Sequence, residues 1–170
     1  MPMASPGGGF APSQDSALTY QAPADWVVEE PSSRMRRAQY RLAKAAGDQE
    51  DAEMVVFFFP GQGGSVNANV DRWIGMFTRA DGSAASGDAK IDKRQINDQT
   101  ITVVDVSGVY TNTMAPMGAG SPKPDYRMLA AIVETPGGPW FFKLTGPAKT
   151  VGKWEPSFNS FLGTIRGGQA

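Results

Sequence analysis

A glycine-rich turn is the first place in this sequence where chemistry could be located. It lies in FFFPGQGGSVNANVDRW, residues 57–73, between an apolar run and an amphipathic segment. Glycine lets backbone N–H groups approach a ligand, and a helix that begins after such a turn attracts anions. The candidate residues for a weak anion or nucleotide site are Gly61, Gly63, Gly64 and Ser65. The turn lacks the lysine of a Walker-type loop, so we favour the alternative, in which Ser65 caps the following helix.

Asp105 is the candidate for acid–base chemistry. In DQTITVVDVSGVY it has the same parity as Ile101 and Val103, so its carboxylate is expected to face a core. A carboxylate is costly there unless it is paired, and a perturbed pKa would suit a hydrolase or transferase. The second group of such an enzyme would be Lys143 or Glu134. The alternative, which we favour, is a structural ion pair or hydrogen bond.

The composition removes much of the usual enzyme chemistry. The 170 residues include no histidine and no cysteine, which excludes Ser-His-Asp and Cys-His catalysis, thiolate metal sites and disulfides. What remains for an enzyme is carboxylate, Lys, Tyr, Ser or Thr chemistry, or an oxygen-ligand metal such as Mg or Ca. We assign no catalytic residue, no cofactor and no metal site, and we expect a protein that is not an enzyme. The 16 Lys and Arg residues balance 17 Asp and Glu residues, so nucleic acid is not an expected partner.

Two segments carry the candidates for binding a protein partner. The insertion TNTMAPMGAGSPKPD, residues 111–125, contributes Met114, Met117 and Lys123, because flexible apolar side chains in a long loop suggest an interaction. The basic run RMRRAQYRLAK contributes Arg37 and Arg41. As a strand, this run would direct both arginines away from the face of Ala38 and Leu42, toward an acidic partner or a lipid head group. The alternative, which we favour, is a solvated edge paired with Glu29, Glu30 or Glu53.

The pattern of apolar residues predicts the elements that position these candidates. Strands are predicted over DWVVEEP, RMRRAQYRL, AEMVVFFF, KIDKRQI, DQTITVVDVSGVY, YRMLAAIVET and WFFKLTG. The segment RMRRAQYRL also matches a helical face through Met35, Ala38, Leu42 and Ala45, and of the two we prefer the strand. The short break PGGP requires an antiparallel hairpin. A helix of three to four turns is predicted from the stripe Val66, Val70, Trp73, Ile74 and Phe77. A second helix, with Pro156 at its first position, is predicted from Phe158, Phe161, Leu162 and Ile165.

These elements predict an α+β fold, a three-layer α/β/α sandwich with a mostly antiparallel central sheet and one helix on each face. Residues 1–22 are predicted to be a disordered linker or tether, residues 23–166 a single domain, and residues 167–170 a flexible tail. No run of residues approaches the length of a membrane span. The Pro/Gly/Ser-rich start is typical of a linker after a removed secretion signal or lipid anchor. We therefore expect an extracytoplasmic protein that is periplasmic, secreted or lipid-anchored through a membrane tether upstream of residue 1.

The order of elements resembles the PsbP-like superfamily. The resemblance covers about residues 23–166 and includes the helix NANVDRWIGMF and a closing helix after LTGPAKTV. The segments PSSRMRRAQYRL, GGSVNANVDRW and FFKLTGPAKTV resemble uncharacterised bacterial envelope proteins and lipoproteins of this shape. FPGQG also resembles a signature of malonyl-transfer acyltransferases, but that family needs a histidine, which this chain lacks. The PsbP-like resemblance implies a non-catalytic binding or accessory protein of the bacterial envelope, and any metal site proposed for relatives would have to be rebuilt from carboxylates.

Overall fold

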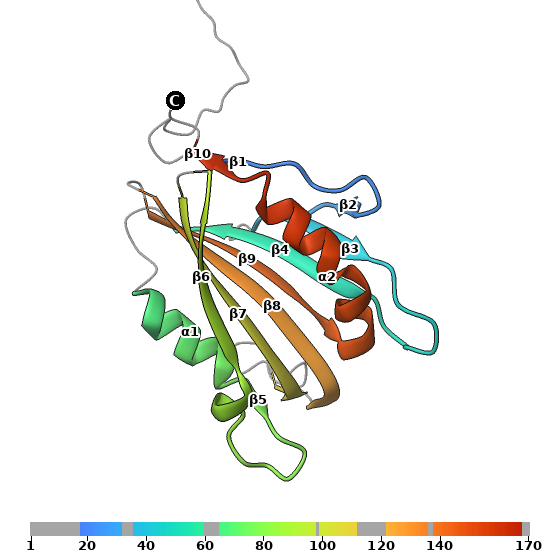
Figure 1. The fold of residues 1–170 in the computed structure, drawn as a ribbon. Helices are drawn as coiled ribbons and strands as arrows, with labels where there is room; N and C mark the ends of the chain where they lie inside the picture. Colours follow the sequence, from blue (N-terminus) through green and yellow to red (C-terminus); the bar gives the residue numbers. More distant parts are fainter. Residues whose placement is uncertain are drawn as a thin grey trace, which may run out of the picture.

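A large antiparallel sheet forms the centre of the molecule (Figure 1). The computed structural model describes residues 18–31, 36–59, 65–97, 99–111, 122–135 and 138–167. The eight-stranded sheet has the order β2-β3-β4-β9-β8-β7-β5, and β6 pairs with β7 beside β5. Its strands are β2 (Val27–Glu29), β3 (Arg36–Leu42), β4 (Ala52–Phe58), β5 (Phe77–Thr78), β6 (Lys90–Ile96), β7 (Gln99–Tyr110), β8 (Lys123–Thr135) and β9 (Gly138–Pro147). The predicted strands, including the β8–β9 hairpin, are confirmed.

One helix packs on each face of this sheet (Figure 1). The face covered by α2 (Ala148–Leu162), here called the α2-side face, has a core in which Phe158, Phe161 and Leu162 are fully enclosed. The opposite, α1-side face packs against α1 (Val66–Ile74), chiefly through Trp73. Strands β4, β7, β8 and β9 contribute to both cores, as their apolar residues on both parities require. The predicted α/β/α arrangement is confirmed.

Both helices differ in their bounds from the prediction. Helix α1 has nine residues and ends at the C-cap Gly75, so Phe77 belongs to β5, where it pairs with Tyr110. Pro156 lies inside α2 and not at its start, because the helix already begins at Ala148. Thr150 and Val151 are buried, and their burial stabilises the turns before Pro156. This gain outweighs the loss of the one backbone hydrogen bond that the proline cannot donate.

The fold extends beyond the predicted domain boundaries. Strand β1 (Leu18–Thr19) pairs with β10 (Arg166–Gly167). The ring of Tyr20 contacts the rings of Phe142 and Phe161 edge-on, at 5.6 and 5.4 Å between centroids. Residues 18–22 therefore belong to the α2-side core, which corrects the boundary predicted at residue 23, and Gly167 belongs to a strand rather than to a tail. Neither helix in the described ranges is both long and apolar enough to cross a membrane.

Candidate functional site

The glycine turn is described only at its end. Gly61, Gly63 and Gly64 lie outside the described residues, as does Pro60. Ser65 has an extended backbone, and its hydroxyl accepts a hydrogen bond from the Ala68 N–H at 3.0 Å. This is the N-cap geometry expected from the sequence, so the structural role of Ser65 is confirmed.

Asp105 has a structural partner. The guanidinium of Arg127 donates to both carboxylate oxygens, from Nε at 2.9 Å and from Nη2 at 2.7 Å, and Nη2 also donates to Glu155 of α2 at 3.0 Å. These contacts place Asp105 on the α2-side face. Lys143 is on the other face, against Trp73 of α1, and Glu134 pairs with Pro139 near the end of β8. The structure therefore does not bring together the acid–base set proposed around Asp105.

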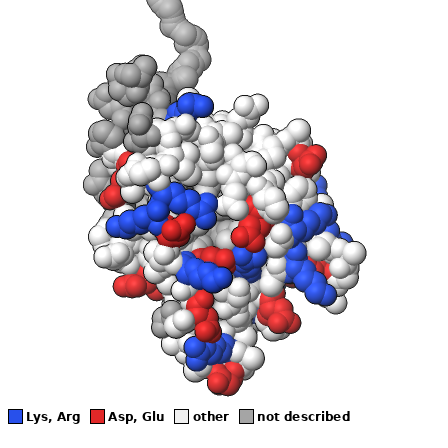
Figure 2. Space-filling view, viewed as in Figure 1, with Lys and Arg blue, Asp and Glu red and all other residues white. Residues whose placement is uncertain are grey.

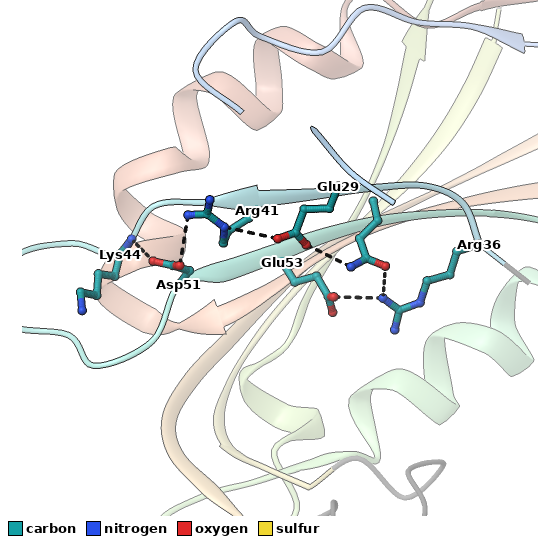
Figure 3. A network of polar contacts seen from close by, with 7 residues as sticks. Glu29, Arg36, Arg41, Lys44, Asp51 and Glu53 are labelled. Carbon is teal, nitrogen blue, oxygen red and sulfur yellow. Dashed lines mark hydrogen bonds and ion pairs between the residues drawn. The ribbon is translucent and has the colours of Figure 1, made fainter. Parts of the chain in front are cut away.

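A row of charged side chains crosses the α1-side face at the β2–β3–β4 edge (Figure 3). We call it the charged row; its members are Glu29, Arg36, Gln39, Arg41, Asp51 and Glu53. Arg41 pairs with Glu29 at 3.3 Å and Asp51 at 3.4 Å, and Arg36 pairs with Glu53 at 2.9 Å. Gln39 joins the two halves, because its amide donates to Glu29 and its carbonyl accepts from Arg36. The predicted pairing with Glu29 and Glu53 is confirmed.

Arg37 does not lie with Arg41, which corrects the prediction. The pairing of β3 with β4 shifts between Arg36 and Ala38, and this β-bulge reverses the alternation of side chains. The guanidinium of Arg37 consequently lies over the rings of Phe58 and Trp140, at 5.2 and 5.6 Å from their centroids. Both rings belong to the α2-side core, so Arg37 covers an apolar surface.

The other predicted binding residues surround the β7–β8 connection. Met114 and Met117 lie outside the described residues. Lys123 begins β8, donates to Glu50 at 2.8 Å and lies over the ring of Tyr126. Hydrogen bonds from Lys123 and then from Tyr126 hold the pKa of the Glu50 carboxyl below its usual value. Lys123 is therefore already paired within the fold.

Lys143 is the residue whose surroundings the sequence did not predict. On β9 it projects from the α1-side face, with Nζ 5.2 Å from the ring centroid of Trp73 and 5.9 Å from that of Phe57. Within the described part of the chain its ammonium group has no hydrogen bond and no ion pair. Burial, reinforced by the charges of Arg72 and Arg36 and opposed by Glu53, lowers the pKa of Lys143 to about 8.

The Lys143 site comprises Lys143, Arg36, Arg72, Glu53, Phe57 and Trp73. Arg72, in the last turn of α1, donates to the neutral amide oxygen of Asn69. Glu53 already pairs with Arg36. The site thus carries three cations and one carboxylate, which suits an anion better than a metal ion. The described residues also contain no group of three or more acidic side chains that could hold a metal.

A sequence signal for this site existed. Lys143 is the one charged residue in WFFKLTG, a strand whose neighbours are apolar on both parities. Sequence patterns suggest Lys143 only as a second group for Asp105, because the face to which each side chain belongs depends on the strand register.

Comparisons with known proteins agree with this architecture. No protein-family model and no curated protein matches the chain. Among solved structures it is similar to the cyanobacterial PsbP (CyanoP) of Synechocystis, with a TM-score of 0.53 and 12% identity over 95% of this chain and 96% of that one. The fold is PsbP-like.

A second similar structure is a protein of unknown function from Pseudomonas aeruginosa, with a TM-score of 0.52 and 11% identity over 83% of this chain and 96% of that one. The likeness confirms the predicted PsbP-like fold. At these identities it shows the fold alone, so the function has to be argued from the residues.

Proposed function

We propose that this PsbP-like chain is a non-catalytic accessory protein that binds a protein partner through its α1-side face. The observation that carries the proposal is the charged row together with the Lys143 site. The α2-side face is closed by a helix of 15 residues and by the segment around Tyr20. The shorter α1 leaves the strands β2, β3 and β4 of the other face with partly exposed charges: Arg41 is 45% exposed and Glu53 46%.

Two described candidates for chemistry, Asp105 and Ser65, have structural roles, and this supports binding rather than catalysis. Asp105 is held by Arg127, and Ser65 caps α1. Catalysis would call for a group with a free proton or lone pair facing a second polar group in a cleft. The charged row instead resembles the polar part of an interface, where charges select the partner and its orientation.

The mixture of charges favours a protein as the partner. In the charged row acids and bases alternate, and Figure 2 shows Lys and Arg next to Asp and Glu over the surface in view. Nucleic acid selects surfaces of one sign, since its binding depends on neutralising many phosphates. A mixed row can be matched only by a surface that also carries both signs, as protein surfaces do.

We also propose that the protein acts outside the cytoplasm, anchored through its N-terminal end. Support comes from the Pro/Gly/Ser-rich start of the sequence and from the position of β1. Leu18 and Tyr20 pack in the α2-side core, so a tether that precedes residue 18 would leave the α1-side face open toward a partner. Localisation by fractionation of the producing cells tests this part of the proposal.

Site-specific photo-crosslinking in the producing cells tests the binding face. Val27 is 41% exposed and lies opposite Arg41 in the register of β2 and β3, so a photoreactive residue there reports on the charged row without removing a charge. Ser160, exposed on α2, is the matched control on the other face. We expect one protein to crosslink from position 27 and not from position 160. Equal crosslinking from both positions, or from 160 alone, would refute this binding face.

A further inference from the structure

Lys143 is a half-buried cation that has no ion pair in the part of the chain that the structure describes. Its Nζ lies over two aromatic rings, and neither of the β-strand neighbours opposite it, Val55 on β4 and Ala130 on β8, can supply a charge. The charged groups that act on it electrostatically are Arg72 from α1, Arg36 from β3 and Glu53 from β4. A partly desolvated ammonium group in a surplus of positive charge is stabilised by an anion that arrives from outside.

We infer that the Lys143 site receives one carboxylate side chain, an aspartate or glutamate of the protein partner, between Lys143 and Arg72. This inference rests on the proposed function and specifies which feature of the partner the face recognises. Glu53 is engaged by Arg36 at 2.9 Å, whereas Arg72 is engaged by the neutral Asn69. Among the described residues, two positive charges therefore remain to be matched.

The chemistry of the surrounding groups selects a carboxylate borne on a short aliphatic stem. A guanidinium and an ammonium group together can donate to both oxygens of a carboxylate. The ring faces of Phe57 and Trp73 flank the ammonium group, and Phe57 is partly exposed, so the methylene groups of a glutamate could pack against it. The adjoining charged row would then hold the rest of the partner in register.

Binding at this site should depend on pH in a defined direction. The carboxylate favours the charged form of Lys143, whose pKa of about 8 in the free protein must then rise on binding. Affinity is therefore expected to be full below that value and to fall as the pH increases through it.

NMR of protein labelled with ¹³C at the lysine side chains tests the inference directly. The probe is an acetylated and amidated peptide, Gly-Gly-Glu-Gly-Gly, and its controls are the same peptide with glutamine, sodium acetate and inorganic phosphate. Lys153 provides a matched residue on the other face, because its Nζ also lies over an aromatic ring, 5.1 Å from the centroid of Trp154. The variants are Lys143→Met and Lys153→Met.

We expect the glutamate peptide to shift the Lys143 signal saturably, with a dissociation constant on the order of millimolar, as suits one charged contact. The glutamine peptide should cause no shift, and the response should weaken at least about tenfold from about pH 7 to about pH 9.5. Lys143→Met should abolish binding of the glutamate peptide, and Lys153→Met should leave it unchanged. Since the wild-type signal is read first, the result does not depend on how a variant folds.

Other outcomes overturn the inference. A response to acetate without one to the peptide indicates a small-molecule site, and a stronger response to phosphate indicates a phosphate site. A response that Lys153→Met removes as well places the binding elsewhere. If photo-crosslinking finds a partner at position 27 while the peptide does not shift the Lys143 signal, this inference fails and the proposed function stands. If Lys143 responds while position 27 finds no partner, the proposed function fails.

Discussion

Arg127 and Lys143 are cations on neighbouring strands, β8 and β9, that project from opposite faces of one sheet. Arg127 lies between two carboxylates, Asp105 and Glu155, which the fold itself supplies. The charges of Arg72 and Arg36 act on Lys143, which has no ion pair among the described residues. The fold therefore neutralises the cation on the α2-side face and leaves the cation on the α1-side face to be matched from outside.

The same difference extends to the packing around these two residues. On the α2-side face, rings from β1–β2, β9 and α2 meet one another, as in the contacts of Phe161 with Trp26 and Phe142. On the α1-side face the core is limited to the part of the sheet near α1, and charged side chains continue from it to β2. Exposed ion pairs of this kind contribute little to stability.

The largest predicted difference concerns the packing of the two faces. Phe161→Ala should lower the free energy of unfolding by about 3 to 5 kcal/mol, because the ring is fully enclosed and its removal leaves a cavity. Phe57→Ala should cost about half as much, since Phe57 is partly exposed. Urea denaturation measures both. Equal losses of unfolding free energy in the two variants would show that the two faces are equally well packed.

Arg127→Met should have the next largest effect, a loss of about 2 to 3 kcal/mol, because it leaves Asp105 and Glu155 without their counter-ion. This loss of stability is smaller than that expected for a fully buried ion pair, because the side chains of Arg127 and Asp105 are 17% and 23% exposed. Arg94→Met is the control, since its pair with Asp92 is exposed and should contribute less than about 0.5 kcal/mol. If both variants lose the same stability, Arg127 is not an internally matched cation.

Lys143→Met, unlike Arg127→Met, should cause no loss of stability near neutral pH. The pKa of Lys143 is lowered to about 8 in the folded protein, so between that value and the ordinary lysine pKa the unfolded chain binds a proton that the folded chain has released. Wild-type stability should therefore rise across this window, by about 1 to 2 kcal/mol relative to Lys143→Met. Urea titrations of both proteins from about pH 7 to about pH 10 measure the difference, and parallel curves would contradict it.

Arg41→Ala should have the smallest effect on stability, less than about 0.5 kcal/mol, because its two ion pairs are weakly held and exposed. It should nevertheless reduce photo-crosslinking from position 27, since it breaks the charged row where we expect the partner to bind. A variant that loses stability without losing the crosslink would assign Arg41 to the fold alone.

The sequence predicted those features that depend on local patterns. Strands apolar on both parities required cover on both faces, and Ser65 after the glycine turn marked the start of α1. The predictions from sequence were wrong where a single residue changes the backbone geometry. The bulge at Arg37 moved that side chain to the other face, and the buried turns before Pro156 extended α2 toward its N-terminus. The Lys143 site could not be predicted, because Arg36, Glu53 and Arg72 reach it from three different elements.

The titration of Lys143 in the free protein, followed by ¹³C NMR of its side chain, tests the central claim most directly. The claim is that this ammonium group is partly desolvated and has no ion pair among the described residues. The account predicts a pKa of about 8 for Lys143. A pKa at or above the ordinary lysine value of about 10.4 would show that Lys143 is solvated or already paired, and would contradict the account.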